Sequence, residues 1–370
     1  MKKQDQVSLL IDTEELVARL GAIPTPLLDW YAVSARSLPW RSDPTPYHVW
    51  LSEIMLQQTR VEAVIPYYHR FLEALPDIPA LANADEEQLH KLWEGLGYYS
   101  RVRNLHRAAI QVMERYDGML PPSYELLLDL SGIGEYTAGA IASIAFGIPE
   151  PAVDGNVLRV ISRLMASEAD IAKPQVKSAY RTALKEILPP DAPGDFNQAM
   201  MELGATVCLP NGMPRCETCP LRRYCSGYQQ GNPTLYPLKS EKKPRRVEEK
   251  TVFVICFSDR VLLRKQAKSG LLAGLWELPN LDGGLDEVAA RDWLKQSGIG
   301  VKKLTALPEA KHIFTHIEWR LKGFLVECEP FIPAEGEVLA DAEALEKEYA
   351  LPNAFSAYKK VWQNRKEKAK

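Results

Sequence analysis

The sequence predicts an all-α domain followed by an α+β domain. Apolar residues recur at helical spacing through residues 25–230, whereas short β-rich segments follow from residue 250 onward. Between these regions, residues 229–249 contain three prolines and a mixed-charge run, a composition typical of a linker. We therefore expect a first domain over 1–228, a linker over 229–249, a second domain over 250–362 and a disordered tail over 363–370.

Breaking and capping residues place several helices of the first domain. The apolar pattern that begins at residue 48 is expected to stop at Pro66, and Asp85 can cap a helix that runs toward the glycines at 95 and 97. Gly147 ends a run of small and apolar residues, as expected of a buried helix. These signals predict helices over residues 48–65, 85–97, 104–116, 138–146 and 157–165.

The second domain shows a different periodicity. Its segments are short and rich in β-branched and aromatic residues, with one helical stretch among them. The pattern predicts strands over 251–257, 260–264 and 317–326, and a helix over 285–296.

Composition limits the class of protein. Hydrophobic residues at 46% and charged residues at 25% are ordinary for a globular domain, and no apolar run approaches the roughly twenty residues of a membrane span. The polar start also lacks a signal-peptide core, so we expect a cytoplasmic, nucleoid-associated monomer without membrane contact. A net charge of −3 does not exclude nucleic-acid binding, because binding depends on where the basic residues lie.

A glycine-containing hairpin lies between two predicted helices, over residues 130–138. Gly132 and Gly134 would let backbone N–H groups approach a phosphate at the start of a helix, where the helix dipole favours an anion. An ordinary turn between helices has the same local sequence. The hairpin therefore favours, but does not by itself require, contact with a nucleic-acid backbone.

Two acidic residues are candidates for a functional role. Asp154 precedes Asn156 at the start of a predicted helix, where it is either a plain N-cap or an acid placed beside an anchored nucleotide. Glu53 is a polar position in an otherwise apolar helix, and Gln57 lies one turn later on the same face. Burial would raise the pKa of Glu53, which suits a general acid.

Four cysteines are spaced Cys-x₇-Cys-x₂-Cys-x₅-Cys and indicate a metal site rather than disulfides. By spacing alone, zinc is an alternative to an iron–sulfur cluster. Cys256 and Cys328 fall in predicted strands and are expected to be buried thiols. The candidate ligands are Cys208, Cys216, Cys219 and Cys225.

Five segments, 38–41, the helix around Glu53, 94–99, 131–137 and 153–156, closely resemble the adenine DNA glycosylase (MutY) family of the endonuclease III-like helix-hairpin-helix superfamily. The resemblance implies an all-α helix-hairpin-helix glycosylase domain with a four-cysteine iron–sulfur module, joined to an α+β Nudix-like domain. It implies a [4Fe–4S] cluster, although the first cysteine gap is six residues in the family and seven here. The implied partner is double-stranded DNA that carries 8-oxoguanine:adenine mispairs.

Residue roles follow from the same resemblance. Glu53 would protonate the flipped-out adenine at N7, and Asp154, supported by Asn156 and Tyr136, would stabilise or trap the sugar cation before water completes hydrolysis with retention. Arg41 would hold the adenine, while Gln58 and Tyr98 would enter the base stack. Further DNA-contacting positions are Thr59, Leu96, Gly132 and Gly134.

Tyr136 separates two activities. Bifunctional relatives carry a lysine there whose amine attacks the sugar, and a tyrosine cannot form that imine. The resemblance therefore implies a monofunctional enzyme. The alternative is an endonuclease III-like pyrimidine-damage glycosylase and lyase.

The second domain resembles a Nudix domain without its metal site. Lys295 and Gln296 occupy the places of the paired glutamates that would bind Mg²⁺, so we expect it to bind a base and not to hydrolyse a nucleotide. The family reads 8-oxoguanine with a Phe-Ser-His loop, and this chain has Phe314, Thr315 and His316. A plain turn before the next strand is the other reading of that loop.

Overall fold

The computed structural model describes residues 12–241, 244–267 and 270–368. Within these residues the chain forms two compact units. Unit 1 comprises 12–83 and 104–241, and unit 2 comprises 84–103 together with the described residues from 244 onward.

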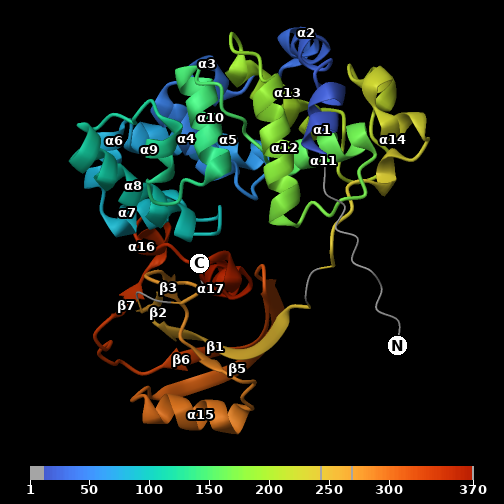
Figure 1. Ribbon diagram of the computed structural model, residues 1–370. Coiled ribbons are helices and arrows are strands. Elements are labelled where there is room, and N and C mark those ends of the chain that lie inside the picture. The colour runs from blue at the N-terminus through green and yellow to red at the C-terminus, as the bar shows by residue number, and fades with distance from the viewer. Residues whose placement is uncertain (1–11, 242–243, 268–269, 369–370) are drawn as a thin grey trace. The chain divides into compact units, whose positions relative to one another are not determined.

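Unit 1 is helical, which confirms the predicted all-α class (Figure 1). Its core joins apolar residues of helices far apart in sequence, among them Leu20, Leu27, Ile161 and Phe196. Its helices are α1 (Thr13–Leu20), α2 (Pro24–Ser34), α3 (Pro39–Ser42), α4 (Pro46–Leu56), α5 (Val61–Ala74), α6 (Ile78–Asn83), α8 (Ser100–Tyr116, whose first turn belongs to unit 2), α9 (Tyr124–Leu128), α10 (Glu135–Phe146), α11 (Gly155–Met165), α12 (Pro174–Ile187), α13 (Pro193–Thr206) and α14 (Ser226–Gln229), with short 3₁₀ turns at Cys216–Thr218, Arg222–Tyr224 and Pro233–Leu235.

The single helix expected over 48–65 is wrong. The chain forms α4 and α5, separated by a turn in which Gln58 adopts a left-handed conformation with φ 57°. Pro66 lies inside α5 and does not end it. Residues 57–60 of the turn are polar, but Ile54 and Val61 on either side of it keep helical spacing, so periodicity alone did not reveal the turn. The break matters because it places residues 57–59 at the edge of a cavity.

The segment that leads to Asp154 is held in place by hydrogen bonds to α13. α10 ends at Gly147, as predicted; this glycine is left-handed (φ 66°), and the chain then turns toward α11. Asn197 of α13 clamps this turn, because its amide accepts from Ala152 N at 3.0 Å and donates to Glu150 O at 2.8 Å. The loop that leads to Asp154 is therefore tied to α13, which lies beside α10 in Figure 1.

Unit 2 is built on a sheet of order β3-β2-β1-β6-β5, with β4 and β7 pairing β1 and β2. β1 and β6 run parallel and the other pairs are antiparallel. The strands are β1 (Arg246–Phe257), β2 (Arg260–Lys265), β3 (Trp276–Glu277), β4 (Asn280–Asp282), β5 (Val301–Ile313), β6 (Ile317–Cys328) and β7 (Glu337–Ala340), and the helices are α7 (Glu86–Leu92), α15 (Glu287–Gln296), α16 (Ala342–Lys347) and α17 (Ser356–Lys368), with a 3₁₀ turn at Asn353–Phe355.

The sheet is covered on both faces (Figure 1). Phe253 and Ile255 of β1 pack with Ala290 and Leu294 of α15. On the opposite face, Tyr358 of α17 lies against Gly323 of β6, where a larger residue would collide with the ring. The predicted α+β class and the helix over 285–296 are confirmed.

Several elements differ from expectation. β5 and α17 were not predicted; α17 continues through Lys368, where a disordered tail was expected, and residues 369–370 lie outside the described part. β1 begins at Arg246, inside the expected linker. Segment 84–103, expected in the first domain, belongs to unit 2, where Glu94 accepts from Leu351 N at 3.2 Å and from Lys359 Nζ at 3.0 Å.

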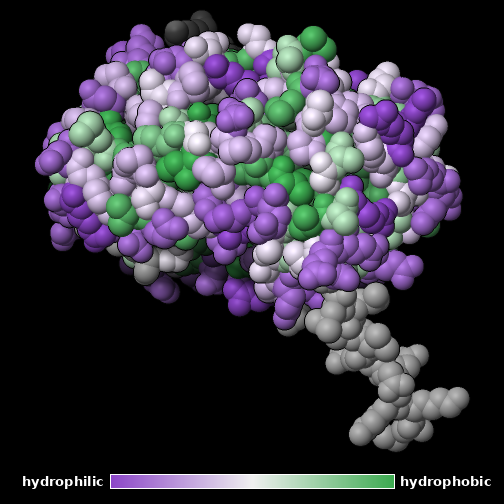
Figure 2. Space-filling view, turned by 45° about the horizontal axis from the view of Figure 1, so that its top comes forward, coloured by the Kyte–Doolittle hydropathy of each residue, from purple (hydrophilic) through white to green (hydrophobic). Residues whose placement is uncertain are grey.

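The described helices are too short or too polar to cross a membrane. The face shown in Figure 2 is mostly hydrophilic, with hydrophobic side chains gathered in short patches between polar ones. That distribution matches helices whose apolar sides are buried in a core.

Candidate active site

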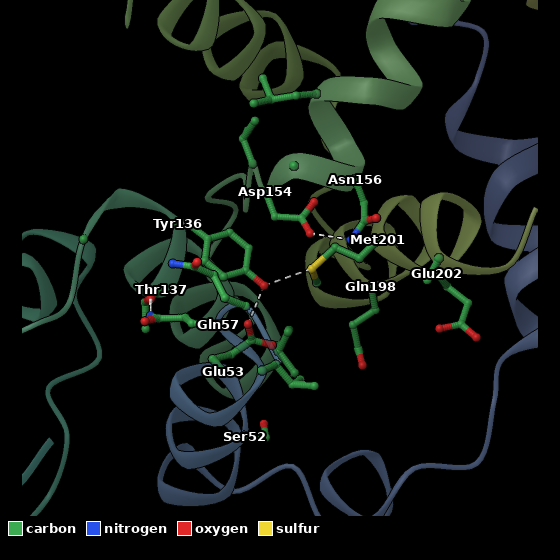
Figure 3. A pocket seen from close by; sticks show the side chains of 18 of the residues that line it. Ser52, Glu53, Gln57, Tyr136, Thr137, Asp154, Asn156, Gln198, Met201 and Glu202 are labelled. Carbon is green, nitrogen blue, oxygen red and sulfur yellow. Dashed lines mark hydrogen bonds between the residues drawn. The ribbon is translucent and has the colours of Figure 1, made fainter. Parts of the chain in front are cut away.

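A cavity of about 950 Å³ lies in unit 1, and both predicted carboxylates line it. Glu53 enters from α4, while Asp154 and Asn156 enter from the start of α11 (Figure 3). Most of the residues that the sequence singles out meet here. The cavity gathers Arg41, Glu53, Gln57, Gln58, Thr59, Gly132, Gly134, Tyr136, Asp154 and Asn156.

Glu53 is buried, with 5% of its surface exposed. Burial raises the pKa of Glu53 to about 7, against the opposing effects of a hydrogen bond from Tyr136 and the charge of Arg41. The charge of Asp154 adds to the increase. A carboxyl group with this pKa holds its proton near neutral pH and can donate it, as expected from its apolar helix.

Tyr136 contacts Glu53 and not the residue expected from the sequence. Its hydroxyl donates to Glu53 Oε2 and lies 3.2 Å from Met201 Sδ, whereas Asp154 has other hydrogen-bond partners. Burial and the neighbouring carboxylates Glu53 and Asp154 raise the pKa of Tyr136 well above its ordinary value. The phenol is therefore a neutral donor to the acid of α4 (Figure 3).

Asp154 is both a helix N-cap and a residue of the cavity. Its Oδ1 accepts from Val157 N at 2.8 Å, and its Oδ2 accepts from Asn156 Nδ2 at 2.6 Å. Burial raises the pKa of Asp154, while these hydrogen bonds favour the charged form. Gly204 of α13 permits the arrangement, because a Cβ there would lie 2.5 Å from Asn156 Cβ.

Arg41 of α3 lines the cavity, and its guanidinium group donates hydrogen bonds to two residues of α13. Nε donates to Gln198 Oε1 at 3.1 Å, and NH2 donates to Glu202 Oε2 at 2.9 Å. Gln198, Met201 and Glu202 all line the cavity from α13 and were not singled out from the sequence. Polar residues four positions apart on a mostly buried helix were the available signal.

The hairpin forms one side of the cavity. Gly132 has φ 78°, and a Cβ at this position would lie 2.6 Å from Asn104 Cβ, so glycine is required for both conformation and space. Gly134 is the N-cap of α10 and lines the same cavity. Gln57 Nε2 lies 3.5 Å from Thr137 Oγ1 and joins α4 to α10. The carboxylates therefore lie beside a helix N-terminus that suits a phosphate.

The loop of residues 314–316 is the turn between β5 and β6 in unit 2. The Phe314 ring packs edge-on against Trp319 at 4.8 Å and His312 at 4.6 Å, and its N–H donates to Ile317 O at 2.8 Å. Within the same unit, Tyr98 Oη lies 3.2 Å from Thr315 Oγ1. Leu96 is buried nearby in sequence, whereas Tyr98 is 45% exposed. Lys295 and Gln296 lie at the end of α15.

The four clustered cysteines line one pocket of unit 1 with apolar neighbours such as Val160 and Leu221. Burial raises the pKa of the Cys219 thiol to about 12 and also raises the pKa values of Cys216 and Cys225. In the described part of the chain, no group of three or more His, Cys, Asp or Glu side chains is placed to hold a single metal ion.

Two regions of the chain match known protein families. Residues 51–190 match the model of the HhH-GPD superfamily of base excision DNA repair proteins, and residues 251–361 match the NUDIX domain. The adenine DNA glycosylase of Mus musculus is 38% identical over 360 residues, which cover 82% of this chain and 70% of the relative.

Solved structures extend the likeness to the fold. A thermostable thymine-DNA glycosylase superposes with a TM-score of 0.52 at 26% identity, over 59% of this chain and 99% of that one. An endonuclease III trapped as a covalent intermediate with DNA superposes with a TM-score of 0.50 at 22% identity, over 60% and 99% of the two chains, and at that identity shows the fold alone. Since similarity to a curated relative extends over most of both chains, the protein belongs to the adenine DNA glycosylase family and is a DNA glycosylase.

Proposed function

We propose that this enzyme removes adenine from double-stranded DNA where adenine is paired with 8-oxoguanine or, less efficiently, with guanine. The observation that carries the proposal is the pair of carboxylates with different environments in one cavity beside the hairpin. Glu53 is buried with a pKa of about 7, while Asp154 accepts two hydrogen bonds that favour its charged form. The name of the relatives supports adenine as the base.

The two carboxylates would divide the reaction. Glu53 gives its proton to N7 of the adenine, which makes the base a leaving group and allows the N-glycosidic bond to break with its electrons. Asp154 then stabilises the positive charge on the sugar, or bonds to it transiently, with Asn156 holding the carboxylate by its 2.6 Å hydrogen bond. Water adds to the sugar and returns one proton, which gives hydrolysis with retention.

Tyr136 supports a monofunctional enzyme. No lysine amine stands at this position to form an imine with the sugar, and the phenol is a donor to Glu53. The alternative of a pyrimidine-damage glycosylase and lyase loses support here. The thymine-DNA glycosylase and endonuclease III structures share the fold with this chain at 26% and 22% identity, below the 38% identity of the adenine DNA glycosylase relative.

The base must leave the duplex to enter a cavity of this kind. Gly132 and Gly134 would hold the phosphate backbone at the N-terminus of α10, and Arg41 would contact the flipped adenine. Gln58, Thr59, Leu96 and Tyr98 are the proposed contacts at the vacated base pair. A DNA substrate leads us to expect that the enzyme works at the nucleoid, as a monomer.

The second domain, residues 250–362, is proposed to recognise the base opposite the adenine through Phe314, Thr315 and His316. The turn between β5 and β6 presents these three residues together. Tyr98, which is proposed to enter the base stack, lies within hydrogen-bonding distance of Thr315 in this turn. Thr315 can donate and accept through its hydroxyl, as a serine would. Lys295 and Gln296 leave the Nudix helix without the paired carboxylates of a magnesium site.

A [4Fe–4S] cluster is the proposed cofactor, and the four cysteines fit it. They surround one apolar pocket, and burial disfavours the thiolates of Cys216, Cys219 and Cys225, so a bound metal centre would be needed to hold these side chains deprotonated there. Four cysteine sulfurs around one pocket are the donor set that a [4Fe–4S] cluster requires. When bound, it would supply four iron–thiolate bonds that hold the loops after α13 in place.

The proposed function is tested with labelled duplexes that carry one central adenine opposite 8-oxoguanine, guanine or thymine, treated with enzyme and then with hot alkali. We expect alkali-dependent cleavage at the adenine, strongest opposite 8-oxoguanine. Phe314→Ala should reduce the preference for 8-oxoguanine over guanine, whereas Ile332→Ala, at a 95% exposed position of the same domain, should not. Equal cleavage opposite all three bases would contradict the specificity.

A further inference from the structure

Glu202 is a buried acid in the cavity whose charge has no role in the chemistry proposed above. It lies on α13, one turn after Gln198, and only 1% of its side chain is exposed. Two arginines from a separate part of the chain surround it, Arg36 after α2 and Arg41 in α3. An acid buried this deeply requires such partners.

The contacts of Glu202 are close and nearly saturated. Oε1 accepts from Arg36 Nε at 2.6 Å and from Arg36 N at 3.3 Å, while Oε2 accepts from Arg36 NH2 at 3.0 Å and from Arg41 NH2 at 2.9 Å. Burial by itself would raise the pKa of Glu202, but the hydrogen bonds and charges of Arg36 and Arg41 outweigh burial and hold the pKa below its ordinary value. Glu202 is therefore an anion shared by two cations.

This shared anion fixes the orientation of Arg41. The other nitrogens of that guanidinium donate to Gln198 Oε1 at 3.1 Å and to Arg36 O at 3.0 Å, and the group lies over the Tyr31 ring. Without the Glu202 carboxylate, Arg36 and Arg41 would face each other with no opposing charge. The guanidinium group of Arg41 would then lose both the hydrogen bond that orients it and the negative charge that balances it beside the cavity.

We propose that Glu202 is a positioning residue for excision: it holds Arg41 in the orientation that receives the flipped base, and it neutralises the two arginines beside the acid Glu53. This inference rests on the proposed function, because it assumes that Arg41 meets the base. A purely structural ion pair is the competing explanation. The two differ in what they predict for the acid on α4.

The charged groups around Glu53 determine whether loss of the Glu202 charge raises or lowers the pKa of Glu53. Tyr136 contacts it from α10, Asp154 acts from the start of α11 and Arg41 acts from α3. Glu202 is balanced by Arg36 and Arg41, with Asp195 and Tyr31 also near that group. Removing the charge of Glu202 leaves more net positive charge beside Glu53, which lowers the pKa of Glu53. The acid would then lose its proton, and the enzyme its activity, at lower pH.

The test compares full-length Glu202→Gln with the wild type in single-turnover excision of adenine opposite 8-oxoguanine across pH. We expect the maximal rate to fall about 10²-fold, the size of effect that misplacing a substrate-holding group produces. The alkaline limb of the profile should move to lower pH by on the order of one unit. Affinity for a duplex with a tetrahydrofuran abasic site should stay unchanged, because that DNA has no base for Arg41.

Glu150→Gln is the matched control. Glu150 is also buried and doubly paired, with Arg181 at 2.9 Å and Lys185, but it does not itself line the cavity. Its variant should keep the wild-type alkaline limb. If Glu202→Gln does not fold, Arg36→Gln provides a second variant. It removes a positive charge where Glu202→Gln removes a negative one, so the pKa of Glu53 should rise. The alkaline limb of the pH profile should then move to higher pH.

Three outcomes would overturn the inference. An unchanged rate and limb in Glu202→Gln would show that the charge has no role. A loss of excision and of abasic-site binding in parallel, with no movement of the limb in Glu202→Gln or Arg36→Gln, would make the cluster merely structural. A folded wild-type enzyme that leaves adenine in every duplex would overturn this inference together with the proposed function, and only in that case would both fail.

Discussion

Replacing Tyr136 with phenylalanine tests the link between a hydrogen bond and the acid of the cavity. The phenol donates to Glu53 Oε2, and this bond lowers the pKa of Glu53 while burial raises it. Tyr136→Phe removes the donor and keeps the ring, so the cavity stays filled. The pKa of Glu53 should therefore rise above its wild-type value of about 7.

The size of the change follows from the chemistry of the bond. A hydrogen bond to a charged group contributes about 1.5–3 kcal/mol, and about 1.4 kcal/mol corresponds to one pKa unit. The alkaline limb of the excision profile should consequently move up by roughly 1–2 pH units. At pH 8 only about one tenth of the wild-type acid would be protonated, whereas about half to nine tenths of the variant acid would be.

The assay is the single-turnover excision rate of adenine opposite 8-oxoguanine, measured from pH 5 to 9 with each profile scaled to its own maximum. Scaling separates the position of the limb from any loss of maximal rate. Tyr180→Phe is the control, because it removes a buried hydroxyl that lies 3.4 Å from Ser162 Oγ outside the cavity. A limb that stays in place or moves to lower pH in Tyr136→Phe would refute Glu53 as the acid.

Three further predictions use other properties of the site. The pKa of Glu53 rises from 4.5 to about 7 on folding, so the unfolded chain ionises first and the wild type loses up to about 3 kcal/mol of stability as pH rises between these values. Glu53→Gln should thus be more stable than the wild type at pH 8 and no more stable at pH 4; urea unfolding that gives the same difference at both pH values would contradict this. Asp154→Asn should abolish excision and keep affinity for mispaired DNA in a gel-shift assay, since asparagine also caps helices; a folded variant that no longer binds would argue against the catalytic role. Cys219→Ser should lower both the iron content of the purified protein and its melting temperature, and unchanged iron would exclude the cysteine as a ligand.

The residues around Asp154 show which features could be predicted from the sequence and which could not. The helix that follows it, the end of α10 at Gly147 and the small residues of α10 could all be predicted, because caps and breakers act within one or two turns. Whether Asp154 is a cap or an acid of a cavity could not be decided locally. The structure shows that it is both, since the loop held by Asn197 brings it into the same cavity as Glu53.

The turn at residues 57–60 and the strand β5 were missed for a related reason. The apolar residues on either side of the turn keep helical spacing, and β5 has mostly exposed residues with an irregular register against β6. Its pairing is decided by the neighbouring strand and not by its own sequence. The same holds for segment 84–103, whose contacts with residues 265–359 belong to no local pattern.

By itself, the sequence determined the two fold classes, the hairpin with its glycines and the spacing of the four cysteines, and it singled out the two candidate carboxylates. These depend on residue type and short spacing, which the chain carries directly. Only the tertiary structure decided which acid Tyr136 contacts, and that Gln198, Met201 and Glu202 complete the cavity. Glu202 lies 161 residues from Arg41, and contacts of that length arise only when α3 and α13 pack together. The protonation state of Glu53 was decided there too, because burial and the charges brought near by folding set its pKa.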